Sequence, residues 1–141
     1  MLNKEFLQRK VKLIQEDLVK LEPLLHRSFA DVTSDDLAYS ALERWLERIV
    51  TRAIDINRHI ISELGKGTEK VRSYQDTYLA LSTLGVYSEE FAKQIAPSAG
   101  LRNVLVHEYD DVDKKLIYES INDAVSQYTE YCASILSLIS K

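Results

Sequence analysis

The residues best suited to chemistry lie together in one segment, residues 102–109, which reads RNVLVHEY. Arginine presents a planar, permanently charged fork that suits phosphate oxygens. Histidine titrates near neutral pH and can act as a general acid or base. Asparagine can orient an imidazole or donate a hydrogen bond to a phosphate. Arg102, Asn103 and His107 are therefore the candidate site residues.

The spacing of these residues limits how they can cooperate. On a helix, Asn103 and His107 lie four residues apart and share a face, whereas Arg102 and His107 lie five apart and do not. For both charged groups to act on one substrate group, the helix must distort or end near His107, or a second copy of the chain must complete the site. A composite site in a two-fold homodimer is therefore expected.

This set of side chains suits metal-independent RNA cleavage, in which a 2′-hydroxyl attacks the adjacent phosphate. His107 would move protons, and Arg102 would stabilise the charge that develops on the phosphorus centre. The sequence offers no glycine-rich phosphate loop, Ser-His-Asp set or metal-binding cluster that would support another reaction. An arginine followed five residues later by a histidine nevertheless arises by chance in roughly one chain in ten. The pair alone therefore leaves a structural role open.

The composition is that of one helical domain. With 141 residues, 45% hydrophobic and 28% charged, the chain can bury one core without metal or disulfide support, and we expect a single domain over residues 1–141. No stretch is apolar enough to span a membrane, and the first residues, MLNKE, show no apolar signal region, so we expect a cytoplasmic protein. The net charge of −4 argues against broad electrostatic capture of nucleic acid, but it allows a local basic site.

Hydrophobic periodicity predicts an all-α fold, an up-and-down bundle of four or five helices. The first helix should run from about Asn3 to His26, with Pro23 able to kink it or end it early. The polar run 31–36 is interpreted as a loop with an N-cap at its end. Further helices are predicted from there to Leu64, over residues 74–84, through Phe91 and Ile95 as far as Pro97, around the candidate segment, and after the capping residue Asp113.

Arg44, Arg48 and Arg52 lie four residues apart on one side of the second long helix. The favoured interpretation is a solvated face with exposed pairs to Glu43 and Glu47. The alternative is a basic stripe that binds RNA or a protein partner.

Three other residues are weighed as weaker candidates. His26 and His59 are interpreted as surface or packed histidines rather than catalytic ones. Asp55 could face the site from the second long helix, but a structural or solvated role is at least as well supported.

The segment 102–109 resembles the R-x4-H-x-Y motif of HepT-like toxins, within the larger HEPN superfamily. The likeness extends from about Leu37 to the C-terminus. Residues 41–56 and 59–61 resemble the second helix of the family. Residues 84–86, Phe91 and residues 96–101 resemble its approach to the motif, and residues 109–113 resemble its exit.

The resemblance implies an all-α homodimer with a ribonuclease site in a cleft at the dimer interface, acting on RNA such as tRNA or mRNA. Arg102 and His107 correspond to the catalytic pair, and Asn103 to its usual polar companion. Neither a metal nor a cofactor is implied.

The family also implies a small nucleotidyltransferase antitoxin that transfers AMP from ATP onto the motif tyrosine, Tyr109. AMP there would add bulk and negative charge close to His107 and repel an RNA phosphate. The alternative function is a non-catalytic HEPN module that docks the nucleotidyltransferase or supplies its substrate tyrosine.

Overall fold

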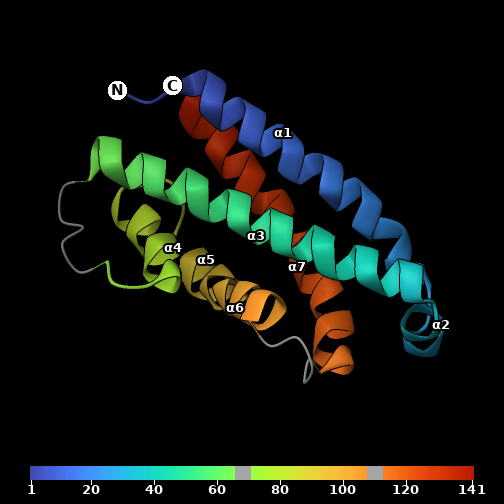
Figure 1. The fold of residues 1–141 in the computed structure, drawn as a ribbon. Helices are drawn as coiled ribbons and strands as arrows, with labels where there is room; N and C mark the ends of the chain where they lie inside the picture. Colours follow the sequence, from blue (N-terminus) through green and yellow to red (C-terminus); the bar gives the residue numbers. More distant parts are fainter. Residues whose placement is uncertain (66–70, 108–112) are drawn as a thin grey trace.

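The computed structural model describes residues 1–65, 71–107 and 113–141, and these residues are all-α, without a strand (Figure 1). The all-α prediction is confirmed. The described residues hold seven α-helices, more than the four or five predicted, because several are short. In chain order the elements are α1 (Lys4–Leu21), the 3₁₀ turn η1 (Glu22–His26), α2 (Phe29–Ser34), α3 (Asp36–Leu64), α4 (Tyr74–Thr83), α5 (Glu89–Ile95), the 3₁₀ turn η2 (Ala96–Ser98), α6 (Ala99–His107) and α7 (Lys114–Ile139).

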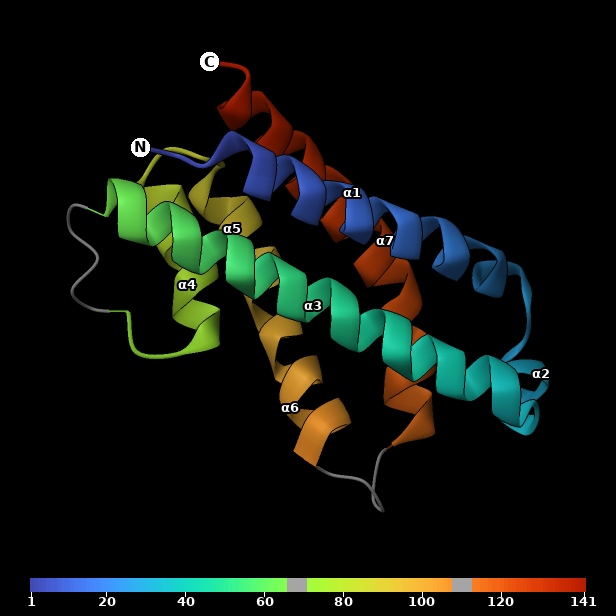
Figure 2. The same ribbon diagram turned by 45° about the horizontal axis from the view of Figure 1, so that its top comes forward.

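The three long helices α1, α3 and α7 form the frame, and α4, α5 and α6 lie on the side of α3 away from α1 (Figures 1 and 2). The start of α1 meets the end of α3, since the Asn3 backbone N–H donates to His59 Nε2 at 3.0 Å. The start of α7 meets the end of the first helical segment, where the Tyr118 hydroxyl donates to the Arg27 carbonyl. Both contacts make α1 antiparallel to its neighbours. The contact with Asn3, together with the Phe6 ring 5.2 Å from the His59 ring, confirms that His59 is a packed histidine.

The first helix ends earlier than predicted. The α-helical part stops at Leu21, and Pro23 lies in the first turn of η1, which carries the chain to His26. Proline lacks the backbone N–H that would continue the α-helix, and its ring clashes with the preceding turn. Pro23 therefore ends α1, as one of the two sequence interpretations proposed.

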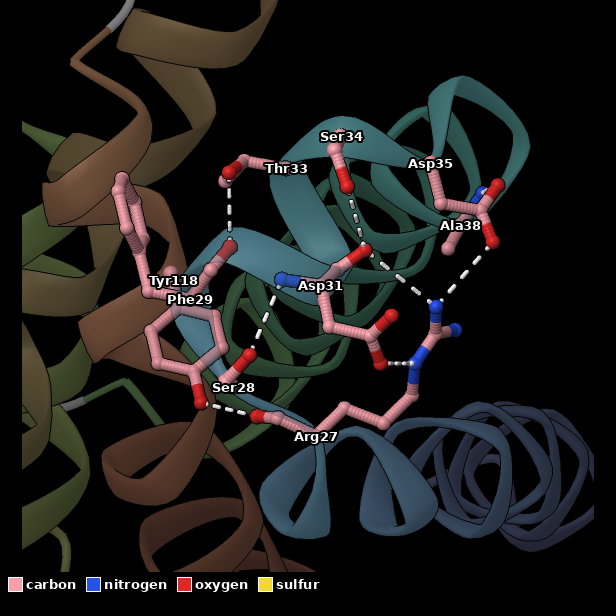
Figure 3. A network of polar contacts seen from close by, with 9 residues as sticks. All are labelled: Arg27, Ser28, Phe29, Asp31, Thr33, Ser34, Asp35, Ala38 and Tyr118. Carbon is pink, nitrogen blue, oxygen red and sulfur yellow. Dashed lines mark hydrogen bonds and ion pairs between the residues drawn. The ribbon is translucent and has the colours of Figure 1, made fainter.

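The prediction of a loop over residues 31–36 is wrong for most of that run, because Phe29–Ser34 form α2. Ser28 Oγ caps this helix by accepting from the Asp31 backbone N–H at 3.1 Å. Arg27 joins the two helices on either side of the bend, with Nε 2.7 Å from Asp31 Oδ2 and Nη2 3.2 Å from Asp35 Oδ2 (Figure 3). The N-cap predicted at the end of this run is present: Asp35 caps α3 by accepting from the Ala38 backbone N–H at 3.1 Å.

Arg27 makes the stability of this bend depend on pH. Its hydrogen bond is the main reason why the pKa of Asp31 lies below the ordinary 3.8. The pKa of Asp35 is lowered first by the Ala38 N–H and then by Arg27. A carboxyl group with a lowered folded-state pKa stabilises the fold above its unfolded pKa, and this contribution is lost as the pH falls through the folded value.

Replacing Arg27 with glutamine should therefore lower Tm at pH 7, and the difference from wild type should shrink as the pH falls below about 3.8. Thermal unfolding followed by circular dichroism from pH 7 to pH 2 measures this. Arg9→Gln, an exposed change on α1, is the control and should leave Tm unchanged across the range. A difference for Arg27→Gln that stays constant down to pH 2 would contradict the account.

The core joins α1, α3, α4, α5 and α7 in one cluster. Each fully buried leucine or isoleucine contributes about 1.5–3 kcal/mol of hydrophobic free energy. The largest wholly buried side chains are Tyr78, Tyr128, Tyr131, Leu7, Ile14, Leu21, Leu42, Leu46, Ile49, Ile56, Ile60 and Leu81.

Among the described helices, none is long and apolar enough to cross a membrane.

A buried polar network fixes the start of α4. Asn57 Nδ2 on α3 donates to Thr77 Oγ1 at 3.1 Å, and Thr77 Oγ1 donates to the Tyr74 carbonyl at 2.6 Å. The Tyr131 hydroxyl on α7 donates to Asn57 Oδ1 at 2.5 Å and closes the network. Buried polar groups are costly unless they are paired, so this network holds α3, α4 and α7 in one arrangement.

A second network anchors the chain just before α6. Ser98 Oγ lies 2.6 Å from the Tyr128 hydroxyl, which lies 2.6 Å from the Tyr78 hydroxyl. Burial raises the pKa of Tyr128 to about 12, so its hydroxyl stays protonated and available for these bonds at neutral pH. The two networks therefore set the positions of α4 and α6, which carry the residues of the candidate site.

Candidate functional site

The candidate segment lies on α6, which packs against α3 and the start of α4. Arg102 is half-buried and Asn103 is exposed. Arg102 and His107 both lie within α6 (Ala99–His107). Tyr109 and the side chain of His107 lie outside what the structure describes.

Arg102 is held by an aromatic ring. Its guanidinium carbon lies 5.2 Å from the centroid of the Tyr74 ring at the start of α4. A cation above a tyrosine face within about 6 Å is attracted to it, by about 0.5–2 kcal/mol. Among the described residues, no carboxylate forms an ion pair with Arg102. The ring therefore orients the guanidinium. Because no described carboxylate pairs with Arg102, its N–H groups remain available to bind an anionic ligand.

Asn103 lies at the edge of a pocket of about 590 Å³ between α3, the segment before α4, and α6. This volume is within the range of small-molecule sites, about 300–1,000 Å³. Two arginines line it, Arg58 on α3 and Arg72 before α4, and neither forms an ion pair within the described part of the chain. The other described lining residues are Ile61, Ser62, Val71, Ser73, Tyr74, Thr77 and Asn103.

The pocket and the Tyr74 contact were not predicted from the sequence. Tyr74 lies 28 positions before Arg102 in the chain. No local spacing links these residues, since the contact depends on how α4 and α6 pack on α3. The one signal in the sequence that could have indicated the pocket is a pair of arginines, Arg58 and Arg72. They lie on either side of the break predicted after Leu64.

The arginine stripe on α3 is largely paired within the chain. Arg48 Nε and Arg52 Nη1 lie 3.3 Å and 2.9 Å from Asp17 Oδ2 on α1. The Asp17 side chain is fully buried. Arg44 pairs with Glu47 at 3.2 Å and is the most exposed of the three.

The solvated-face interpretation therefore holds for Arg44, whereas Arg48 and Arg52 neutralise a buried carboxylate that the sequence did not reveal as their partner. Binding of RNA or a partner by this stripe stays a prediction.

The structure gives no catalytic role to the weaker candidates Asp55 and His26. Asp55 Oδ2 pairs with Lys10 Nζ at 3.1 Å, which gives it a structural role between α3 and α1. His26 is exposed at the end of η1. In residues 1–65, 71–107 and 113–141, no group of three or more His, Cys, Asp and Glu side chains is placed to hold a metal ion.

Solved structures share the fold. YutE from Bacillus subtilis, a cytosolic protein of unknown function, has a TM-score of 0.81 at 16% identity, covering 98% of this chain and 91% of that chain. The tri-AMPylated HEPN toxin of Shewanella oneidensis, solved in complex with its MNT antitoxin, has a TM-score of 0.79 at 16% identity, covering 97% and 99%. At this level of identity the likeness shows the fold alone.

Sequence comparison is more specific. The family model "Ribonuclease HepT-like" matches residues 14–135. The tRNA nuclease HepT of Aphanizomenon flos-aquae is 38% identical over 135 residues, covering 94% of this chain and 89% of that protein. A match of this length at this identity, on a shared all-helical fold, confirms the resemblance to the family. The chain belongs to the HepT-like family of ribonucleases.

Proposed function

We propose that the chain is the toxin of a toxin–antitoxin pair, a metal-independent endoribonuclease that cuts tRNA or mRNA in the cytoplasm. It works as a homodimer of single HEPN domains, each spanning residues 1–141. The observation that carries this proposal is Arg102, a guanidinium oriented by Tyr74 beside a cationic pocket and without an ion-pair partner among the described residues. The similarity to a tRNA nuclease supports it.

The proposed mechanism divides the work among three residues. Arg102 donates to the phosphate oxygens and stabilises the added negative charge as the 2′-oxygen attacks. His107 moves the protons: the 2′-hydroxyl must lose one, and the leaving 5′-oxygen must gain one. Asn103 orients the substrate or the imidazole. Because one imidazole cannot do both in one step, a second His107 from the other copy of the chain would supply the second proton transfer.

The activity is tested with protein free of AMP, incubated with tRNA in excess EDTA. The proposal predicts fragments that carry 2′,3′-cyclic phosphate and 5′-hydroxyl ends. If wild type, Arg102→Ala and His107→Ala leave the RNA equally intact, the non-catalytic module that docks a nucleotidyltransferase becomes the better description.

Control of the toxin by its antitoxin is proposed to act through Tyr109. A nucleotidyltransferase partner would transfer AMP from ATP to the Tyr109 hydroxyl, releasing pyrophosphate, and the added phosphodiester charge would repel RNA from the cleft. The Shewanella oneidensis relative in fold is itself a tri-AMPylated toxin bound to an MNT antitoxin.

Intact mass spectrometry after incubation with the partner and ATP should show the mass of one or more adenylyl groups, and Tyr109→Phe should prevent this gain. Tyr118→Phe is the matched control. It should still be modified at Tyr109, because the Tyr118 hydroxyl already donates a hydrogen bond to the Arg27 carbonyl and is not the proposed acceptor of AMP. Adenylylation that persists in Tyr109→Phe would move the assignment to another residue.

Tyr74 is predicted to be a positioning residue for Arg102. Tyr74→Ala removes the ring and should lower kcat about 3- to 30-fold, the equivalent of the cation–π energy. Tyr74→Phe keeps the ring and should stay within about two-fold of wild type. Steady-state cleavage kinetics distinguish the two, with Tm as the control for folding. Wild-type kcat in Tyr74→Ala would eliminate the positioning role, and an equal loss in both variants would assign the effect to the hydroxyl.

A further inference from the structure

The pocket beside Asn103 has the charge of an anion-binding site. Among its nine described lining residues, two are arginines and none is acidic. The whole chain carries a net charge of −4, so this is a local reversal of sign. The nearest acid on α4, Asp76, already accepts from the backbone N–H groups of Arg72 and Ser73 at 2.9 and 3.2 Å.

The two arginines come from different elements and converge on the pocket. Arg58 is near the end of α3, and Arg72 is two residues before α4. Both side chains are exposed, and neither pairs with a carboxylate within the described ranges. This contrasts with Arg48 and Arg52, which share Asp17. Arg58 and Arg72 therefore keep their guanidinium donors for an anionic ligand, and phosphate oxygens match that fork.

The rest of the pocket suits a flat, partly apolar group with polar edges. Ile61, Val71 and the Tyr74 ring supply apolar surface, and Ser62, Ser73 and Asn103 supply hydrogen-bonding groups. One lining residue is held firmly in place, since Thr77 is buried and accepts a hydrogen bond from Asn57. A phosphate attached to a sugar and a heteroaromatic ring, which is a nucleotide, meets both requirements.

The pocket is also continuous with the catalytic segment. Asn103 lines it, and Tyr74 lines it while contacting Arg102. A ligand in this pocket therefore lies next to the guanidinium that would bind the phosphate to be cleaved.

We propose that this pocket binds one nucleotide of the RNA substrate, immediately beside the bond that is cut. Arg58 and Arg72 hold its phosphate, and its base lies against the wall made by Ile61, Val71 and Tyr74. The base must be unpaired to enter, so the pocket selects single-stranded loops over duplex RNA. This inference rests on the proposed ribonuclease function and names its substrate-positioning site.

The test measures RNA binding separately from cleavage, in full-length protein carrying His107→Ala so that RNA stays intact. Binding of a short fluorescent oligouridylate is titrated from low to high salt. Arg58→Met and Arg72→Met should each raise Kd about five- to ten-fold. Because both arginines hold one phosphate, the two substitutions together should reduce the slope of log Kd against log salt by about 0.7, the value for one single-strand phosphate contact. Arg9→Met, an exposed arginine on α1 outside the pocket, should change neither quantity.

In the wild-type background, the same two substitutions should raise KM for cleavage with kcat within about two-fold of wild type, because they remove binding that is equal in the ground and transition states. Both arginines are exposed, so Tm should not move.

Each outcome decides the proposal. Unchanged Kd and salt slope in both arginine variants, or no binding of oligouridylate by the parent protein, would overturn it. Free AMP, used as a second probe, distinguishes the ligand source: AMP binding that is lost in these variants while RNA binding is unchanged would make the pocket an adenylate site. If the variants weaken RNA binding but wild type does not cleave RNA, the pocket assignment stands and the ribonuclease proposal fails.

Discussion

Replacing Arg102 with alanine should lower kcat for RNA cleavage by about 10²- to 10³-fold, the cost of losing one preorganised donor to a developing oxyanion. The guanidinium is held over the Tyr74 ring at 5.2 Å, so wild type has no reorganisation to make when charge builds on the phosphate. The free energy of unfolding should hardly change, because removing the Arg102 side chain leaves no carboxylate unpaired among the described residues. Single-turnover rates with saturating protein measure the effect.

Arg102→Lys separates charge from shape at the same position. Lysine retains the positive charge but loses the planar fork that fits two phosphate oxygens. Its rate should therefore fall between those of wild type and Arg102→Ala. A lysine variant as fast as wild type would show that charge alone suffices. An alanine variant as fast as wild type would remove Arg102 from the mechanism.

Replacing Arg48 and Arg52 together with methionine should lower the free energy of unfolding by about 3–5 kcal/mol. Their shared partner, Asp17, has no exposed side-chain surface, and both arginines bind its Oδ2 atom. The remaining cation is Lys20, whose Nζ atom lies 3.9 Å from Asp17 Oδ1. Without the arginines a buried carboxylate is left with this one distant partner, and an unpaired buried charge is strongly destabilising. Urea unfolding measures the change.

Two further variants test the cause of that loss. Arg44→Met breaks only the exposed pair with Glu47 and should change the free energy of unfolding by less than about 0.5 kcal/mol. Adding Asp17→Leu to the double variant removes the buried charge and should recover most of the stability. If the double variant unfolds at the same urea concentration as wild type, the arginines do not support Asp17, and the stripe is free to serve as a binding surface.

The helices were predictable wherever hydrophobic periodicity and a capping residue coincided. Asp113 caps α7 as expected. Ser88 caps α5, and Gly85, with φ of +82°, follows the end of α4. The short helix α2 was missed because its six residues are too few to show a helical period, and Val32 is its one buried residue. Its stability comes from Ser28 and from Arg27, whose two carboxylate partners are recognisable only after the chain has turned (Figure 3).

The candidate site was predictable as a segment, but its surroundings were not. The family motif fixes the identity of Arg102 and its neighbours along the chain. The ring under Arg102 and the arginines of the pocket come from α3 and α4, through packing that no spacing in the sequence encodes. The same reason hid Asp17 behind Arg48 and Arg52, since the pairs join residues more than 30 positions apart.

The fold explains how these distant residues stay together. Asn57 on α3 is bonded to Thr77 and Tyr131, which fixes the first turn of α4. Ser98 is bonded to Tyr128 on α7, which fixes the chain just before α6. The Tyr74 ring and the Arg102 guanidinium are therefore carried by two elements that are each anchored to the core, so their contact is preorganised before RNA binds.

The proposed function requires that Arg102 and His107 cut RNA by proton transfer without a metal. The most direct test compares AMP-free wild type with His107→Ala on the same tRNA, in the same EDTA buffer, and identifies the ends of every fragment. We expect 2′,3′-cyclic phosphate ends from wild type and a rate at least about 100-fold lower from His107→Ala. Equal cleavage by the two proteins, or cleavage by wild type that EDTA abolishes, would contradict it.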